Sequence, residues 1–281
     1  KLLLSEIEFL TRKGHLAETV IYAGAAPGEH LSCLAALFPS HTFKAFDPRP
    51  FSSVAAAPNV ELYQEPFSDE VAESFEGPLL FISDIRTADW QSQDPNDHDS
   101  RLLDDMVAQQ RWVHILQPLS SLLKFRLPYS DGVTKYLDGE LCLPVWGPQT
   151  TTECRLLVGP PTCSKFPSKN YDHRDVLERL FYFNTIVRVS LYPRPGALSD
   201  TRLLSAGLCR CFDCSREIGI LMSYLGQRPS QAKVEPLVSL SRDLSVGCGR
   251  GAGGLLTVVP APWERGLVSE KDPIPKRRRA V

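Results

Sequence analysis

The chain has 281 residues, of which 43% are hydrophobic and 23% are charged, so it is long enough to bury one large core. The formal net charge is −2, so no overall positive field attracts nucleic acid, although a local basic groove is compatible with this balance. The sequence has no apolar run of about 18 residues, so we expect no membrane-spanning helix.

Targeting signals and cysteines indicate the compartment. The first residues are too short an apolar run for a signal peptide, and the chain does not begin with Met, so sequence can precede it. Eight cysteines are scattered along a long chain without a secretory signal, which disfavours a disulfide framework. We therefore expect a reducing, intracellular compartment.

The predicted elements alternate between helices and strands. Residues 1–13 have apolar positions at helical spacing and precede Gly14, which predicts an amphipathic helix. Helices are also predicted over 30–38 and 100–113. A polar loop over 87–98 is predicted between the strand at 79–82 and the second of these helices. Strands are predicted at 19–22, 42–46, 60–63 and 79–82, within 114–126, and over the apolar run 155–159. Residues 176–187 fit a helix or a strand equally well.

This alternation predicts an α/β fold with a mostly parallel sheet. Ligands of such sheets bind beyond the carboxyl ends of the strands. Tyr22, Asp47, Asp84 and Lys124 all lie at or near predicted strand ends, so we expect the functional site there.

The composition changes near residue 227. We expect one domain over 1–227 and a poorly ordered tail over 228–281, with a glycine-rich linker at 247–254 and a short strand at 255–259. The tail ends in the basic run Lys276–Arg279, which fits a solvated terminus, a nuclear-localisation signal or an RNA contact.

The loop from Tyr22 to Gly28 connects a strand to a helix, as nucleotide-binding loops do. Its Gly-x-x-x-Gly spacing with an internal Pro departs from the dinucleotide fingerprint and is typical of a methyltransferase loop. Asp47 ends the next strand, where a carboxylate can accept hydrogen bonds from ribose hydroxyls. The alternative is an ordinary strand-to-helix turn.

Lys124 lies within the apolar run Leu122–Phe125, and Asp84 ends another apolar strand. Burial and a neighbouring cation both lower the pKa of a lysine, and a lysine near neutral pKa can act as a general base. The alternative is a strand-edge lysine that reaches water.

Six motifs in order resemble one known family. They are Lys1-Leu2-Leu3-Leu4-x-Glu6, Tyr22-x-Gly24-x-Ala26-Pro27-Gly28-x-His30, Ile82-Ser83-Asp84-x-Arg86, Leu116-x-Pro118 through Lys124-x-Arg126-x-Pro128, Glu153-x-Arg155-Leu156-Leu157 and Tyr182-x-Asn184-x-Ile186-Val187-Arg188. Over about residues 1–190, the chain is similar to the poxvirus cap-specific mRNA (nucleoside-2′-O-)methyltransferases. That family also provides the small, regulatory subunit of the viral poly(A) polymerase.

The resemblance implies a Rossmann-like S-adenosylmethionine-dependent methyltransferase fold, with helices on both faces of the sheet. It also implies a Lys–Asp–Lys–Glu catalytic set at Lys1, Asp84, Lys124 and Glu153, with Arg155 as a supporting cation. Lys124 would take the proton of a ribose 2′-OH, and the scheme requires no metal.

The resemblance further implies two ligand pockets. The residues implied to line the S-adenosylmethionine pocket are Tyr22, Gly24, Ala26, Pro27, Gly28, Asp47, Arg49, Asp84 and Arg86. For the 7-methylguanine of an mRNA cap, Tyr22 and Tyr129 match the two stacking rings and Asp131 matches a carboxylate. A second family acid aligns with Leu177, next to Glu178.

The expected function is therefore ribose 2′-O-methylation of the first transcribed nucleotide of capped mRNA. The alternatives are a ribose methyltransferase for non-cap RNA and an RNA-binding processivity subunit of a poly(A) polymerase. Expected partners are the capped 5′ end, single-stranded RNA held by Arg126 and Arg188, and a polymerase catalytic subunit. The resemblance implies a location in the host cytoplasm or the virion.

The pattern Cys209-x-Cys211-x-x-Cys214 provides only part of a zinc site, because structural zinc has four ligands and no second pair or histidine follows. We expect these cysteines to be thiols without a metal.

Overall fold

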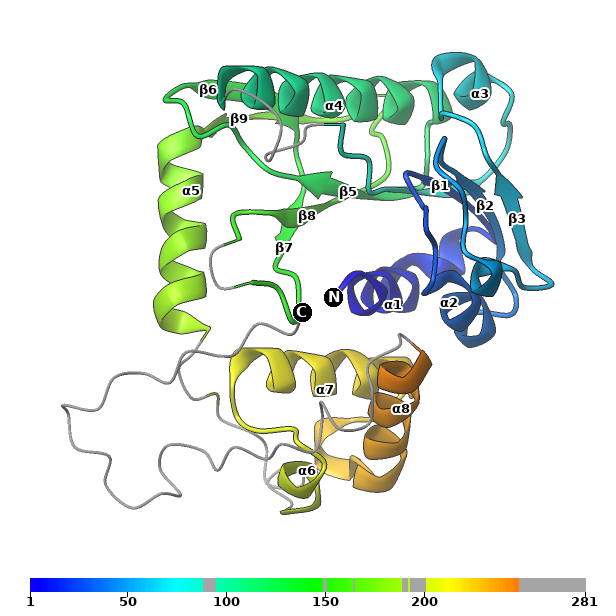
Figure 1. The fold of residues 1–281 in the computed structure, drawn as a ribbon, viewed down its shortest axis with the longest axis vertical. Coiled ribbons are helices and arrows are strands. Elements are labelled where there is room, and N and C mark those ends of the chain that lie inside the picture. Colours follow the sequence, from blue (N-terminus) through cyan, green and yellow to red (C-terminus); the bar gives the residue numbers. More distant parts are fainter. Residues whose placement is uncertain (88–94, 149–150, 164, 189–191, 193–200, 248–281) are drawn as a thin grey trace.

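A seven-stranded sheet forms the centre of the molecule in a computed structural model that describes residues 1–87, 95–148, 151–163, 165–188, 192 and 201–247 (Figure 1). The sheet strands are β1 (Thr19–Ala23), β2 (Thr42–Phe46), β3 (Val60–Tyr63), β4 (Leu79–Ser83), β5 (Ser120–Phe125), β7 (Glu140–Cys142) and β8 (Cys154–Val158). Their spatial order is β3-β2-β1-β4-β5-β8-β7. A separate antiparallel pair joins β6 (Val133–Leu137) to β9 (Ser168–Asp172).

The first five strands of this order are parallel, whereas β8 runs antiparallel to both β5 and β7. The predicted α/β fold with a mostly parallel sheet is thus confirmed. Strand β1 pairs with β2 on one side and with β4 on the other, so the order of strands reverses there. Open α/β sheets bind their ligands at the carboxyl ends of the strands beside such a reversal.

Helices lie on both faces of the sheet, as expected, with α1 and α2 on one face and α3 and α4 on the other. The helices of the described residues are α1 (Leu2–Lys13), α2 (Leu31–Leu37), α3 (Asp69–Glu73), α4 (Pro95–Leu116), α5 (His173–Tyr182), α6 (Thr201–Ser205), α7 (Phe212–Tyr224) and α8 (Val234–Gly247). None of the helices among the described residues has the length and hydropathy to cross a bilayer.

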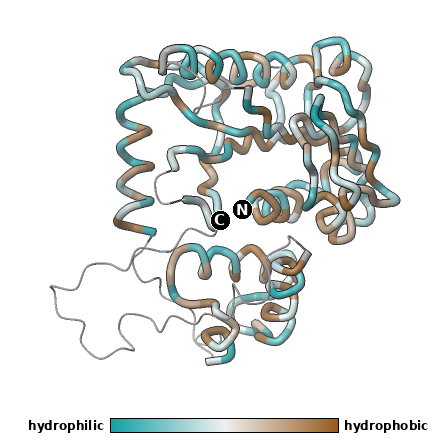
Figure 2. Tube along the Cα trace, viewed as in Figure 1, coloured by the Kyte–Doolittle hydropathy of each residue, from teal (hydrophilic) through white to brown (hydrophobic). Residues whose placement is uncertain are grey.

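Alternating side chains of the parallel strands point to opposite faces and build two cores. On β1, Val20 and Tyr22 join the core formed with α1, α2, α7 and α8, whereas Ile21 and Ala23 join the core formed with α3 and α4. Figure 2 shows hydrophobic stretches along α1 and the central strands. The buried residues of α1 belong to the first core, and those of the strands are divided between the two cores.

One helix begins earlier than expected, and one segment left undecided by the sequence is helical. Helix α4 begins at Pro95 instead of residue 100, so the predicted loop is wrong over 95–98, while 88–94 lie outside the described residues. Proline suits the first turn of a helix because its φ angle is already helical. The undecided segment 176–187 is helical: α5 starts behind Asp172, whose side chain accepts from the backbone N–H of Asp175, and a π-helical turn follows at Phe183–Val187.

The prediction of a poorly ordered tail is wrong for residues 234–247. These residues form α8, which packs against α6 and α7 and buries Val234, Leu237 and Leu244 in the core shared with α1. The spacing of these apolar residues is helical, and this pattern, rather than the nearby glycines, decides the structure. Residues 248–281, with the predicted linker, strand and basic run, lie outside the described part of the chain.

The burial of α8 leads to a stability prediction. Leu237 is fully buried, so Leu237→Ala should lower the free energy of unfolding by about 2–5 kcal/mol in chemical denaturation. The control on the same helix is Val246→Ala, since Val246 is 58% exposed and its loss should cost less than about 0.5 kcal/mol. Equal, small losses for both variants would mean that α8 is not part of the folded core.

Candidate active site

The four residues of the predicted catalytic set lie together at one edge of the sheet. Asp84 follows β4, Lys124 lies in β5, Glu153 precedes β8, and Lys1 precedes α1. Nζ of Lys124 lies 3.3 Å from Oδ1 of Asp84 and 3.6 Å from Oε2 of Glu153. Nζ of Lys1 donates to Oε1 of Glu153 at 3.1 Å.

Arg155 connects the carboxylates of Asp84 and Glu153. Its Nη2 donates to Asp84 at 2.5 Å and its Nη1 donates to Glu153 at 3.1 Å. The antiparallel pairing of β5 with β8 sets Arg155 directly opposite Lys124. The side chain of Arg155 is only 3% exposed, so this cation is held entirely within the protein and acts through the carboxylates.

Arg86 adds a fourth cation beside the network. Its guanidinium lies 3.8 Å from both Glu153 and Asp105, and Asp105 also accepts from the backbone N–H and the hydroxyl of Thr87. Nη2 of Arg86 is buried and has no hydrogen-bond partner among the described residues. If every group were ionised, four cations (Lys1, Arg86, Lys124, Arg155) would face three carboxylates (Asp84, Asp105, Glu153).

This environment shifts the pKa values in opposite directions. Burial lowers the pKa of Lys124 below that of a free lysine, and Arg155 and Arg86 act in the same direction against Asp84 and Glu153. Burial alone would raise the pKa of Glu153, but Lys124, Arg155 and Lys1 hold it well below its usual value. The site therefore contains a permanent carboxylate beside a lysine that loses its proton more easily than usual.

The glycine loop lies beside this network, at the ends of β1 and β2. Gly24 has φ +79°, and a Cβ there would lie 2.7 Å from the backbone N of Ile85. Its N–H donates to the carbonyl of Phe46 at 2.8 Å. The glycine is thus required for the close approach of the loop to the segment that carries Asp84.

Asp47 binds the loop from the end of β2. Its carboxylate accepts from the backbone N–H of Ala26 at 3.0 Å and from both the backbone and the guanidinium of Arg49. Burial opposes ionisation, but these hydrogen bonds lower the pKa of Asp47. Arg49 also donates to the carbonyl of Ala26 at 2.8 Å, while its side chain stays 66% exposed. Pro27 is exposed and Gly28 is buried.

The structure contradicts the expected cap-stacking role of Tyr22. Its ring has no exposed surface, because β1 points it into the core under α1, and its hydroxyl donates to Glu6 at 2.6 Å. His30 contacts the same carboxylate at 3.0 Å. A ring enclosed in this way cannot stack on a base from solvent, and its contribution to a cofactor pocket would be to support the loop.

Tyr129 lies on the surface, 61% exposed, in a loop held by its neighbours. Asp99 of α4 accepts from the backbone N–H of Tyr129 and of Ser130, and His173 contacts the carbonyl of Ser130 at 2.7 Å. The guanidinium of Arg126 lies 4.6 Å from the centre of the Tyr129 ring. Two further expected cap residues are exposed: Asp131 in this loop, and Glu178 on α5, which pairs with Arg174.

The expectation that Arg188 binds RNA is wrong. Its side chain is 2% exposed, pairs with Asp213 at 2.7 Å and donates to the carbonyls of Pro144 and Gly147. Its guanidinium also packs over the rings of Phe183 and Phe212. Arg188 therefore attaches the start of α7 to the region of β7.

Sequence reasoning missed several supporting residues. Glu6 and Asp105 are buried acids, and Asp99 positions the Tyr129 loop. The signal available for Glu6 was an acid among the apolar positions of the first helix, which is unusual unless its charge has a partner.

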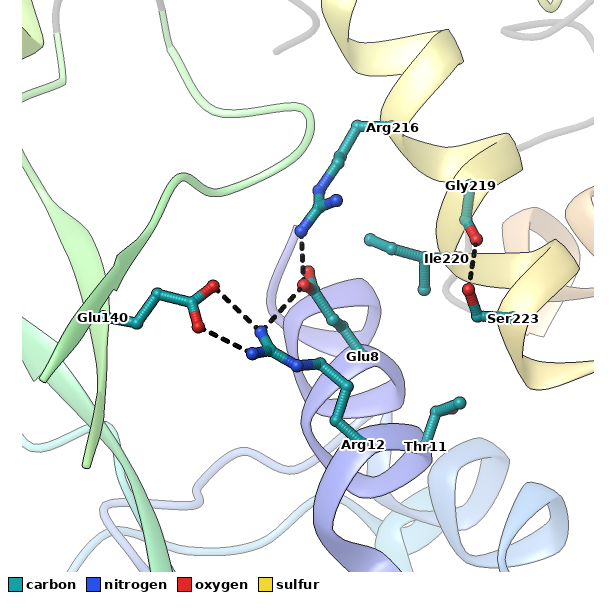
Figure 3. A pocket seen from close by; sticks show the side chains of 8 residues that line it. All are labelled: Glu8, Thr11, Arg12, Glu140, Arg216, Gly219, Ile220 and Ser223. Carbon is teal, nitrogen blue, oxygen red and sulfur yellow. Dashed lines mark hydrogen bonds and ion pairs between the residues drawn. The ribbon is translucent and has the colours of Figure 1, made fainter. Parts of the chain in front are cut away.

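A separate cavity of about 290 Å³ lies between α1, β7 and α7 (Figure 3). Arg12 pairs with Glu140 and Glu8, and Arg216 pairs with Glu8, as the dashed lines show. These ion pairs connect α7 to α1 and do not include the residues of the catalytic set.

The close approach at Gly24 leads to a prediction. Gly24→Ala should destabilise the protein by about 1–2 kcal/mol for the left-handed backbone, plus about 1–3 kcal/mol for the contact with Ile85. Gly77→Ala is the matched control, because Gly77 has φ +89° and a Cβ there meets nothing within 4 Å. Chemical denaturation of both variants should show the larger loss for Gly24→Ala, and equal losses would contradict a tight contact.

The family model described as "Poly A polymerase regulatory subunit" matches residues 1–192. The "Cap-specific mRNA (nucleoside-2'-O-)-methyltransferase" of Myxoma virus (strain Lausanne) is 29% identical over 208 residues, covering 67% of this chain and 60% of that protein. The Fowlpox virus (strain NVSL) protein of the same name is 29% identical over 213 residues, covering 67% of each chain. The chain thus spans about 60% of the length of the Myxoma virus relative.

Among solved structures, bluetongue virus VP4, whose title describes a multifunctional RNA-capping production line, superimposes with a TM-score of 0.51. The identity is 16%, and the match covers 63% of this chain and 30% of that one, so the likeness concerns the fold alone. The family match covers more than half of the chain and contains all four residues of the predicted catalytic set. This protein belongs to the poly(A) polymerase regulatory subunit family.

Proposed function

We propose that the protein transfers a methyl group from S-adenosylmethionine to the ribose 2′-OH of the first transcribed nucleotide of capped mRNA. The observation that carries the proposal is Lys124, a lysine of lowered pKa whose side chain is 13% exposed and lies between Asp84 and Glu153 at the carboxyl edge of the sheet. The names of the Myxoma and Fowlpox virus relatives support the same activity.

The reaction needs a base for the 2′-OH proton, because a hydroxyl is a poor nucleophile. Lys124 in its neutral form accepts this proton, and its lowered pKa increases the neutral fraction near neutral pH. Asp84 and Glu153 orient the amine and stabilise the lysinium ion that results. Lys1 and Arg155 hold Glu153, so they are positioning residues.

The residues at the ends of β1, β2 and β4 fit S-adenosylmethionine. The carboxylates there can lie against a sulfonium cation and accept hydrogen bonds from ribose hydroxyls. Nη2 of Arg86 is a buried hydrogen-bond donor that has no acceptor among the described residues. We assign Asp84 and Arg86 to the reactive end, and Gly24–Gly28, Asp47 and Arg49 to the nucleoside end. When bound, the cofactor supplies an electrophilic methyl group.

Asp47 has a role in the loop before any ligand arrives. Its carboxylate already binds Ala26 and Arg49, so ribose hydroxyls would compete with the exposed Arg49 side chain for it. We propose that Arg49 yields this position on binding.

For the cap, we propose Tyr129 as the stacking ring and Asp131 as the acceptor for the N–H donors of the base. Arg126 lies over one face of the Tyr129 ring, and its charge suits a neighbouring phosphate. Glu178 is the nearest acid to the second family position and is exposed.

A second role follows from the family description. We propose that the protein also acts with a poly(A) polymerase catalytic subunit, as a regulatory subunit that binds single-stranded RNA. The relatives are viral proteins, and the activity on mRNA favours the host cytoplasm or the virion as its location.

The test of the base is Lys124→Ala. The variant should lower the rate of methyl transfer to capped RNA by a factor of about 100 or more, as is typical when a general base is lost. Its affinity for RNA should not change. The assay measures labelled methyl groups on capped RNA with the product position mapped. The control is Lys135→Ala on β6, since Lys135 is exposed and its loss should leave the rate unchanged. Absence of methyl transfer by the unaltered protein would contradict the activity.

The pH dependence distinguishes a base from a structural lysine. Activity should rise with pH as Lys124 loses its proton, with a midpoint below the value of 10.5 for an ordinary lysine. Glu153→Gln removes an anion that favours the protonated form, so the pKa of Lys124 falls further and the midpoint should move to lower pH, with a reduced maximum. An unchanged midpoint in Glu153→Gln would contradict the assignment of Lys124 as the titrating base.

The cap assignment is tested by Tyr129→Ala. Loss of the ring removes a stacking contact of about 1–3 kcal/mol, so kcat/KM on capped RNA should fall about 5-fold to 150-fold. The rate on an uncapped oligonucleotide of the same sequence should not change. Val107→Ala on α4 is the control, because Val107 is similarly exposed at 56% but has no ring that could stack on a base. Equal losses on both RNAs would favour a ribose methyltransferase for non-cap RNA.

A further inference from the structure

Three cysteines meet at the start of α7, outside the methyl-transfer site. Cys209 and Cys211 lie in the segment between α6 and α7, and Cys214 lies in the first turn of α7. Their three Sγ atoms are all within 4.8 Å of one another, and the Sγ atoms of Cys209 and Cys214 are 3.6 Å apart. The local fold therefore directs three thiols at one point.

These separations suit tetrahedral zinc, whose Zn–S bonds of about 2.3 Å place the sulfur atoms about 3.8 Å apart. Sequence spacing alone favoured thiols without a metal, because structural zinc has four ligands and no second pair or histidine follows the three cysteines. We propose that Cys209, Cys211 and Cys214 bind a structural Zn²⁺ ion as thiolates, with a fourth ligand from outside the trio.

The surroundings favour a soft, structural ion. Cys214 is 1% exposed and belongs to the same buried cluster as Leu208 and Ile218, while Cys209 and Cys211 are half-buried. The backbone N–H groups at the start of a 13-residue helix also stabilise a thiolate at this position. Each thiol loses its proton to solvent on coordination, so the three thiolates and Zn²⁺ together carry one negative charge.

The state without metal is chemically distinct. Cysteine coordinates zinc as a thiolate, so the uptake of Zn²⁺ by these thiols must release protons to solvent. Proton release on titration with zinc is a direct signature of the site.

The position of the site explains what the ion would do. Helix α7 packs against α1, and Arg216 of α7 pairs with Glu8 of α1. Helix α1 begins next to Lys1, which contacts Glu153 of the catalytic set. A zinc ion bound at the start of α7 would thus stabilise the packing of α7 against α1, the helix that follows Lys1.

The test is the metal content of the full chain, purified with reductant and without added chelator. We expect one zinc per chain by elemental analysis and, after exchange with Co²⁺, the visible absorption of tetrahedral thiolate coordination. Cys209→Ser and Cys214→Ser should each lose the zinc. Cys163→Ser, which removes an exposed thiol elsewhere, should keep it.

Stability provides the second measurement. Removal of zinc by a chelator should lower the Tm of the unaltered protein and of Cys163→Ser, but not that of Cys209→Ser. Because Cys209 is only half-buried, this variant is the safeguard in case Cys214→Ser does not fold. Unaltered protein that contains no zinc and does not take up Co²⁺ would overturn the proposal. A Cys209–Cys214 disulfide in the reductant-purified protein would also overturn it and assign the pair to redox chemistry.

Discussion

The buried ion network around Lys124 is the constraint on which the rest of the structure depends. Taking charges out of water costs several kcal/mol per ion, and only close, hydrogen-bonded partners offset that cost. Asp84 and Glu153 provide these partners, and Arg155 fixes both carboxylates from within the protein. Burial, together with the nearby Arg155 and Arg86, lowers the pKa of Lys124 and so makes it lose its charge more easily than a free lysine. The same arrangement that keeps the network stable thus suits Lys124 to the role of base that we propose for it.

One antiparallel strand makes this network possible. The parallel strands β4 and β5 bring Asp84 and Lys124 to the carboxyl edge of the sheet, and β8 reaches the same edge with its amino end because it runs the other way. Glu153 precedes β8 and therefore lies at that edge, and pairing in register sets Arg155 opposite Lys124. A parallel strand in this place would have carried Glu153 to the far edge.

The loop beside the network is stabilised from within the protein before any ligand binds. Gly24 permits the close approach to the backbone of Asp84 and Ile85, and Asp47 binds the loop through Ala26 and Arg49. Features that a ligand-binding loop shares with an ordinary turn therefore have structural roles here. Binding of a nucleoside would reuse contacts that already exist, with Arg49 as the movable part.

The sequence by itself determined the alternating elements and the strand-end positions of Asp84 and Lys124, because apolar periodicity and the ends of strands are local properties. Only the tertiary structure decided which side chains meet and which are enclosed. It buried Tyr22 and Arg188, for which a ligand-facing role was expected, since the direction of a side chain depends on what packs over its strand or helix. It also packed α8 into the core shared with α1, because a contact between segments distant in the sequence leaves no local pattern. The 3.6 Å separation of the Sγ atoms of Cys209 and Cys214 depends on the path of the backbone into α7, which the spacing of the cysteines does not specify.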